Sequence, residues 1–218
     1  GQVAPPAWIP GVASVQFTVV EFPAAVPLGG LTLEVCDLAD IDCTTPADSA
    51  MTSAAGEVEV AVSTEASSYF QVTGEGVVDS LFFRRNVPPP SDPYITELGA
   101  LSPGTLGAFI ALTGAQDDAM RGHLIVTARD CDEALAEGVV IEVDTADEAA
   151  TVAYLDGGLP STEATQTDES GRAGVLNLPA GPTVVTTRVA QTGAVIGVRT
   201  IFVRPDQLSL VGMIPTER

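Results

Sequence analysis

The stretch Thr167-Asp168-Glu169-Ser170-Gly171-Arg172, followed by Asn177-Leu178-Pro179-Ala180-Gly181, decides the fold that this sequence predicts. A polar turn ends on a glycine, a short apolar segment follows, and a second turn with Pro and Gly comes about eight residues later. Short strands that alternate with such turns are typical of a small β-sandwich. We therefore expect this part of the chain to form a β-sandwich.

An internal repeat extends this expectation to the rest of the chain. The segments Gly30-Leu31-Thr32-Leu33-Glu34-Val35 and Gly138-Val139-Val140-Ile141-Glu142-Val143 share the pattern Gly, apolar, any residue, apolar, Glu, Val, and lie 108 positions apart. An alternating segment precedes each copy, and a polar excursion follows it. Because solenoid repeats have periods of up to about 50 residues, this spacing indicates two tandem domains instead.

The strands of both copies show the period of two that a half-buried strand requires. Val58, Val60 and Val62 fall on one face, while Glu57 and Glu59 fall on the other, as in an antiparallel strand with one solvated side. The sequence predicts at most about seven strands per copy. The expected strands span 14–22, 30–35, 55–62, 69–73 and 80–84 in the first copy and 123–129, 138–143, 170–178, 184–189, 195–203 and 208–214 in the second.

A proline-rich segment and a helix separate the two copies. Residues 87–93 hold four prolines, which lack the backbone donor of a sheet ladder, so the first domain is expected to end there. Ser102 as N-cap, Pro103 at the first helical position and Gly114 as C-cap predict a helix over about 103–113. The expected organisation is a leader at 1–10, a first β-sandwich at 11–90, a linker at 91–120 and a second β-sandwich at 121–218.

The predicted helix carries an apolar stripe of Leu106, Phe109, Ile110 and Leu112. Such a stripe must be buried, and the sandwiches are the nearest partners, so we expect a packed junction.

Composition excludes several classes of function. Acidic residues outnumber basic ones 29 to 9, which gives a net charge of −20, so nucleic acids and anionic lipid surfaces are repelled. All nine basic residues are Arg, which excludes Schiff-base and P-loop lysine chemistry. No run reaches the roughly 18 apolar residues that a membrane span needs. The start at residues 1–10 is typical of a tether and is compatible with an upstream signal peptide or lipid anchor.

The three cysteines form a close pair and a distant single residue. A disulfide between Cys36 and Cys43 closes a loop of about eight residues and indicates an oxidising compartment, whereas three free thiols indicate a cytosolic protein. We expect the disulfide. Cys131 is expected to be unpaired or to have its partner outside this chain.

The tandem order, the dipeptides Asp42-Cys43 and Asp130-Cys131, and the two turns of the second copy resemble tandem carboxypeptidase regulatory-like domains of bacterial secreted proteins and lipoproteins. The first copy departs from the Thr-Asp-x-x-Gly motif and carries Ser53-Ala54-Ala55-Gly56. The resemblance implies an all-β fold of two tandem transthyretin-like (prealbumin-like) sandwiches with Ig-like, Greek-key topology. It also implies a non-catalytic cell-envelope module that spaces, stiffens or binds, with no catalytic residue carried over.

The presence of a single histidine argues against several enzymatic functions. The single histidine, His123, has no G-x-S-x-G motif to accompany it, and one histidine cannot build the two-His, two-Tyr iron site that intradiol dioxygenases of related fold use. The transthyretin-like hydroxyisourate hydrolases need several histidines and a Tyr-Arg-Gly-Ser ending, which this chain does not carry. Three dispersed cysteines and one histidine also lack zinc-site spacing. We expect no enzymatic activity and no cofactor.

Two loops remain as weak binding candidates. Asp37, Asp40 and Asp42 gather oxygen ligands between the paired cysteines, as Asp130, Asp132 and Glu133 do in the second copy, but neither follows the EF-hand register. Tyr154 lies in the excursion that precedes the Thr-Asp turn and is the weak candidate for a ligand site.

The predicted function is a non-catalytic extracytoplasmic structural or adhesion module at the cell surface, in the periplasm or secreted. Its partner is an unknown protein or surface polysaccharide, bound most economically through a strand edge. The alternative is a glycan- or calcium-binding domain that uses loops 37–43 and 150–166.

Overall fold

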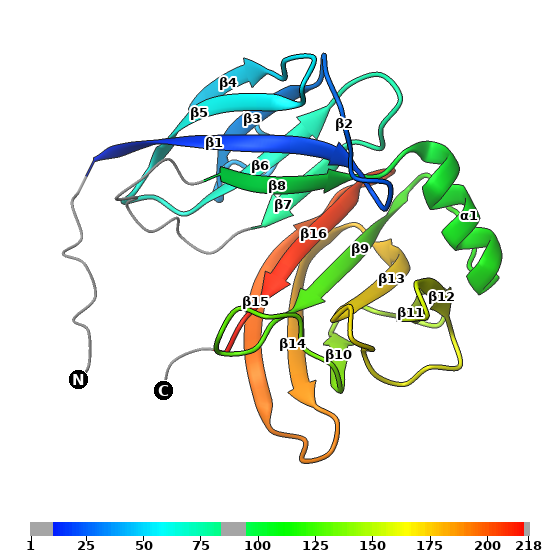
Figure 1. Cartoon of the computed structure of the whole chain (residues 1–218). Helices are drawn as coiled ribbons and strands as arrows, with labels where there is room; N and C mark the ends of the chain where they lie inside the picture. The colour runs from blue at the N-terminus through cyan, green and yellow to red at the C-terminus, as the bar shows by residue number, and fades with distance from the viewer. Residues whose placement is uncertain (1–10, 84–94, 216–218) are drawn as a thin grey trace, which may run out of the picture. The chain divides into compact units, whose positions relative to one another are not determined.

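The computed structural model describes residues 11–83 and 95–215 and consists mostly of strands, with the elements shown in Figure 1. The expected leader at 1–10 and the proline-rich boundary at 87–93 lie outside these residues. Two compact units divide the chain. Unit 1 comprises Gly1–Glu75 and Arg84–Ala100, and unit 2 comprises Gly76–Phe83 and Leu101–Arg218.

Unit 1 is built from two groups of paired strands. In the first, β1 (Val12–Glu21) pairs antiparallel with β2 (Val26–Pro27) and β5 (Glu57–Ser63) and parallel with β8 (Ile95–Ala100). In the second, β3 (Thr32–Asp37) pairs antiparallel with β4 (Asp48–Met51) and β6 (Ser68–Thr73). The rings of Phe17 in β1 and Phe70 in β6 lie 4.8 Å apart, so the core lies between the two groups.

The alternation predicted for β5 is confirmed. Val58, Val60 and Val62 are buried, whereas Glu57 and Glu59 are exposed, and β5 pairs antiparallel with β1. The valines therefore contribute to the core of unit 1, and the glutamates face solvent.

Unit 2 also has two groups of strands. One runs β12 (Leu159–Ser161), β11 (Thr151–Asp156), β13 (Arg172–Pro179), β9 (Arg121–Ala128), β16 (Leu208–Met213) and β7 (Ser80–Phe83), in that order. The other is β10 (Val139–Val143), β14 (Gly181–Val189) and β15 (Val195–Val203), all antiparallel. Phe83 from the first group and Phe202 from the second meet edge to face, with ring centroids 4.9 Å apart.

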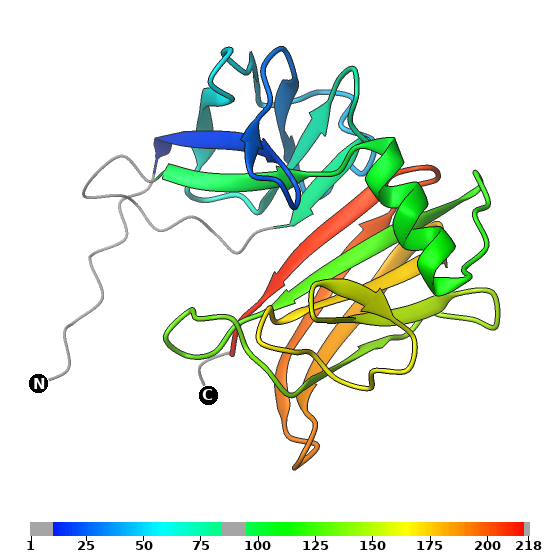
Figure 2. The same cartoon turned by 45° about the vertical axis from the view of Figure 1, so that its right-hand side comes forward.

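Helix α1 (Pro103–Thr113) has the expected bounds and caps. The Ser102 hydroxyl accepts a hydrogen bond from Thr105 N, Pro103 opens the helix, and Gly114 takes the left-handed conformation with φ 67°. The apolar stripe is covered less than expected. Leu106 is buried, whereas Leu112 is 58% exposed. The helix, green in Figure 2, contacts β12, a strand of 3 residues.

Three segments differ from the sequence expectations. The expected linker contains β8, which pairs in parallel with β1 from Gln16↔Ile95 to Glu21↔Ala100. The expected loop at 150–166 contains the hairpin of β11 and β12, whose turn uses the positive φ of Gly157 and Gly158. Strand β7, expected in the first sandwich, pairs with β16 inside unit 2. The partners of β7 and β8 are distant in sequence, so local pattern does not reveal them.

Both units contain the same turn, built from a buried threonine. In unit 2 the Thr167 hydroxyl accepts a hydrogen bond from Val139 N (3.0 Å) and donates one to Ala136 O (2.8 Å). In unit 1 the Thr52 hydroxyl accepts from Leu31 N (2.9 Å) and donates to Leu28 O (2.9 Å). The first copy thus keeps the threonine of the motif.

A glycine closes this turn in both units. Gly171 N donates to Asp168 O, and Gly56 N donates to Ser53 O, each over 2.9 Å. The two glycines have φ of +63° and +75°. A Cβ added to either would lie 2.5 Å from a backbone carbonyl oxygen, so only glycine fits.

Candidate functional site

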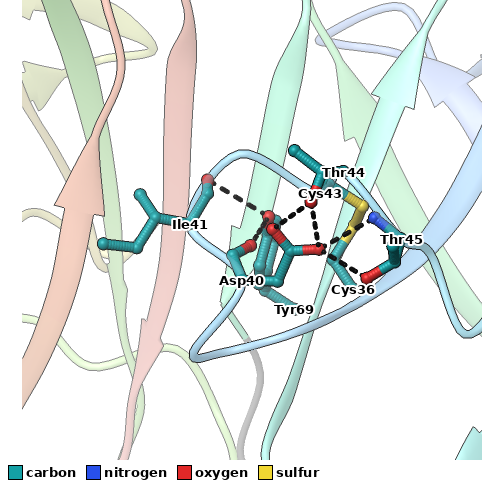
Figure 3. The surroundings of a disulfide bond; sticks show 7 residues. All are labelled: Cys36, Asp40, Ile41, Cys43, Thr44, Thr45 and Tyr69. Atoms are coloured by element: carbon teal, nitrogen blue, oxygen red, sulfur yellow. Dashed lines mark hydrogen bonds between the residues drawn. A yellow bond between two sulfur atoms is a disulfide. The ribbon is translucent and has the colours of Figure 1, made fainter.

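The paired cysteines form the expected disulfide, which closes a loop after β3 (Figure 3). Cys36 and Cys43 are bonded with their Cα atoms 5.3 Å apart. The buried Tyr69 of β6 reaches into the loop, and its hydroxyl donates to Asp40 O at 2.8 Å. The loop is therefore attached to the core of unit 1 by a covalent bond and a hydrogen bond. Among the described residues, Cys131 is a free and exposed cysteine.

Asp40 is used inside this loop. Its carboxylate accepts hydrogen bonds from Thr45 N (2.9 Å), Thr45 Oγ1 (3.2 Å) and Thr44 Oγ1 (3.2 Å), as Figure 3 shows. These bonds, led by the backbone N–H of Thr45, lower the pKa of Asp40. Asp37 accepts from Ala39 N at 2.8 Å, and Asp42 is exposed. Two of the three calcium candidates thus fasten the loop itself.

The tip of the same loop carries apolar side chains. Leu38 is 37% exposed and Ile41 is 47% exposed, although both lie between carboxylates in sequence. This arrangement gives a rigid loop with an apolar tip and acidic flanks. Across residues 11–83 and 95–215, no three His, Cys, Asp or Glu side chains gather closely enough to hold a metal ion.

Tyr154, the candidate ligand residue, is 5% exposed, and its hydroxyl accepts a hydrogen bond from Ile141 N at 3.1 Å. Burial raises the pKa of Tyr154. The N–H groups of Val139 and Ile141 point away from β14, and the hydroxyls of Thr167 and Tyr154 occupy them. The hydroxyl of Tyr154 therefore acts as a hydrogen-bond acceptor for the backbone at the edge of β10.

A polar cluster of unit 2 surrounds Asn177, which the sequence pattern indicated only as the first residue of a turn. The pairing of β13 with β9 shifts between Val175↔Leu124 and Leu178↔Gly122. Leu176 and Asn177 consequently lie opposite one residue, His123, which defines a β-bulge. Asn177 is 1% exposed and has φ of +58°. The consecutive apolar residues Val175 and Leu176 before Asn177 interrupt the alternation of the strand, which is the local signal that the sequence offers.

Asn177 joins three segments through four hydrogen bonds. Its amide Oδ1 accepts from Asp118 N (3.2 Å), and its Nδ2 donates to Ala149 O (3.0 Å). Its carbonyl accepts from the Nε of Arg121 at 2.7 Å, and its backbone N–H donates to the Nδ1 of His123 at 3.3 Å. The bulge therefore holds the loop before β9 and the loop after β10 against β13.

Charged groups surround this cluster. The guanidinium of Arg121 binds the carboxylate of Asp147 with two hydrogen bonds, of 2.6 and 3.1 Å, and the guanidinium lowers the pKa of Asp147.

His123 is 3% exposed, and its Nε2 lies 3.6 Å from the carboxylate of Asp117. Burial lowers the pKa of His123 from 6.5, and the charges of Asp117 and Asp206 oppose this effect. Burial also raises the pKa of Asp79, with a further contribution from Asp206. The structure thus uses the only histidine of the chain as a buried, hydrogen-bonded core group.

No protein-family model and no curated protein matches this chain. Among solved structures it is similar to the shaft pilin SpaA of Lactobacillus rhamnosus GG, with 12% identity, 95% of this chain and 99% of that chain covered, and a TM-score of 0.31. The minor pilin GBS52 of Streptococcus agalactiae is 13% identical over 94% of this chain and 98% of its own, with a TM-score of 0.29.

The Bacillus anthracis TIE protein is 11% identical with a TM-score of 0.33, and the matched region covers 94% of this chain but 34% of that one. The chain thus spans about a third of the TIE protein. These low TM-scores assign the chain to no family. Within the described residues, no helix has the length and apolar character to cross a membrane.

Proposed function

We propose that this chain is a non-catalytic, extracytoplasmic structural module that carries mechanical load. One observation carries the proposal: in each unit the first long strand pairs in parallel with the last strand. β1 pairs with β8 over six residue pairs, from Gln16↔Ile95 to Glu21↔Ala100. β9 pairs with β16 over six residue pairs, from Leu208↔His123 to Met213↔Ala128.

Parallel pairing of the terminal strands decides how a unit responds to force. In a parallel pair, the start of the first strand and the end of the last strand lie at opposite ends of the ladder. Tension applied at these two points slides one strand along the other, so that all the ladder hydrogen bonds are loaded together. In an antiparallel pair joined by a hairpin, tension opens the bonds one after another. The terminal pairs β1–β8 and β9–β16 therefore resist extension.

The disulfide supports the location outside the cytoplasm. Bonds such as Cys36–Cys43 persist in oxidising compartments and are rare where thiols are kept reduced. We further propose that the units are tandem sandwiches of the carboxypeptidase regulatory-like kind and that they contact a protein or a surface polysaccharide. The identical threonine turns at Thr52 and Thr167 support a common origin of the two units.

The alternative role in calcium or glycan binding gains no support from loops 37–43 and 150–166. Asp40 already accepts its hydrogen bonds from Thr44 and Thr45, and Tyr154 is buried. The load-bearing role is therefore the function we propose.

Single-molecule force spectroscopy tests the proposal. Handles attached outside β9 and β16 load the parallel pair. Handles at positions 184 and 200, which are paired across β14 and β15 and are not buried, load an antiparallel pair from one end. Cys131→Ser removes the exposed thiol so that handle chemistry is specific. We expect a several-fold higher rupture force for the parallel geometry, since forced unfolding follows the barrier of the loaded path. Equal rupture forces in the two geometries would contradict the proposal.

A further inference from the structure

The bond between Asn177 and His123 depends on the protonation state of the histidine. Asn177 N–H donates to His123 Nδ1, so Nδ1 carries a lone pair and the single proton of the neutral ring is on Nε2. That proton faces the carboxylate of Asp117, with Nε2 and Oδ1 3.6 Å apart. When the ring is protonated, Nδ1 also becomes a donor, and two N–H groups face each other at a buried bulge.

Loss of this bond affects more than one pair of residues, because Asn177 is also the attachment point of two loops. Its amide holds Asp118 N from the α1–β9 loop and Ala149 O from the β10–β11 loop. Asn177 has a positive φ, a conformation that Asn adopts more readily than most residues with a Cβ, and its hydrogen bonds hold it in this position. Removal of the backbone bond therefore weakens the contacts that hold residues 114–120 and 144–150.

The charged groups around His123 come from several elements. Asp117 precedes β9 and Asp206 lies in the turn between β15 and β16, and both attract a protonated ring. Asp79, next to β7, interacts with Asp206 and is partly buried. On β9 itself, Arg121 bonds to the Asn177 carbonyl and is neutralised by Asp147. Burial outweighs the attraction, since the pKa of His123 is lowered in spite of Asp117 and Asp206.

We propose that His123 is a pH-sensitive switch: protonation of its Nδ1 breaks the bond from Asn177 N and releases loops 114–120 and 144–150 from β13. The bulge holds these loops at neutral pH and frees them in a mildly acidic environment. The switch acts through the side chain of His123 on loops 114–120 and 144–150, and it does not require the load-bearing role.

Linkage gives the size and direction of the effect. A closed state with a histidine pKa below 6.5 resists protonation, while an open state titrates near the ordinary value of 6.5. The stability of the closed state is therefore complete above about pH 6.5 and is lost as the pH falls below it. Between 6.5 and the lower pKa of the closed state, the ratio of open to closed loops rises about tenfold per pH unit.

Two measurements test the switch. Because the chain has 1 histidine, its C2 proton gives one NMR resonance whose titration reports His123 directly. Amide hydrogen exchange of Asn177 and of residues 114–120 and 144–150, corrected for intrinsic pH dependence, reports opening. We expect a midpoint below 6.5 and a rise in corrected exchange as the pH falls from 7.5 to 5. Unchanged corrected exchange over this range would overturn the proposal.

Matched variants separate the switch from a general acid effect. His123→Asn places an amide oxygen near the position of Nδ1, so it keeps an acceptor for Asn177 N without a titrating group. We expect its loops to exchange equally slowly at both pH values. Asp117→Asn removes a charge that favours the protonated ring in the closed state. We therefore expect the NMR midpoint to move to lower pH and the rise in corrected exchange between pH 7.5 and pH 5 to be larger than in the wild type. An acid-induced opening that persists in the His123→Asn variant would overturn the proposal, as would an Asp117→Asn variant with an unchanged midpoint.

Discussion

Removing the hydroxyl of Thr167 is the most direct test of the turn that defines both units. Thr167 is 1% exposed, and its hydroxyl links Val139 N to Ala136 O. Thr167→Val keeps the shape of the side chain and removes both hydrogen bonds. The buried N–H of Val139 and the partly buried carbonyl of Ala136 then lose this partner.

The expected cost follows from these two bonds. A typical hydrogen bond contributes about 1 kcal/mol net, and a buried group left without a partner costs about 1–3 kcal/mol. The methyl group of Val costs less to remove from water than the hydroxyl of Thr, which offsets a part of this cost. We therefore expect Thr167→Val to reduce the free energy of unfolding of unit 2 by about 2–4 kcal/mol. Thr167→Ser retains the hydroxyl and loses one methyl group, which is worth about 1 kcal/mol.

Hydrogen exchange at increasing urea concentration measures each unit separately, because peptides from residues 11–75 and from residues 121–215 are distinguished by mass. In Thr167→Val, peptides of unit 2 should lose protection at lower urea, while peptides of unit 1 change little. Thr52→Val should give the converse result, since Thr52 makes the same two bonds in unit 1. If Thr167→Val and Thr167→Ser unfold at the same urea concentration, the reasoning about the hydroxyl is refuted.

Three further predictions concern the loop, the glycine turn and acid. Reduction of the Cys36–Cys43 bond should lower the free energy of unfolding by about 2.5 kcal/mol, the chain-entropy value for a loop of about eight residues; urea titration with and without reductant measures it, and equal midpoints contradict it. Gly171→Ala should lower the free energy of unfolding more than Gly193→Ala, because an added Cβ lies 2.5 Å from Ala128 O at position 171 and meets open space at position 193. At position 193 only the positive φ costs about 1–2 kcal/mol. Thermal unfolding of both variants gives the order of stability, and the reverse order contradicts the prediction. Because the pKa of Asp40 is lowered in the folded protein, its contribution to stability is present above about pH 3.8 and is lost as the pH falls through the pKa of the folded state. The difference in free energy of unfolding between the wild type and Asp40→Asn should therefore shrink in acid. A difference that stays constant from pH 7 to pH 2 rules this out.

Local patterns in the sequence are enough to predict some elements. The alternation in β5, the caps Ser102 and Gly114 of α1, and the short spacing of Cys36 and Cys43 each depend on residues within one segment. Such features depend on interactions over a few residues, so they can be predicted from the local sequence.

Non-local pairing accounts for what the sequence did not reveal. β8 follows a proline-rich segment, and its pairing with β1 joins residues such as Gln16 and Ile95 that no local pattern connects. Likewise, Ser80–Phe83 has the pattern of a strand, but its pairing with β16 depends on residues more than 100 positions away. The polar cluster at Asn177 depends on a bulge, which changes the partner of every group around it and is visible only once β13 and β9 are paired.

The hydroxyls of Tyr154 and Thr167 protect the edge strand β10 from pairing with other molecules. An edge strand with unpaired N–H groups can pair with a strand of a neighbouring molecule, and such pairing is a common first step of aggregation. On β10, the outward N–H groups of Val139 and Ile141 are already occupied from within the same unit. A neighbouring copy that adds a strand along β10 would therefore have to displace the hydroxyls of Thr167 and Tyr154 from these two donors.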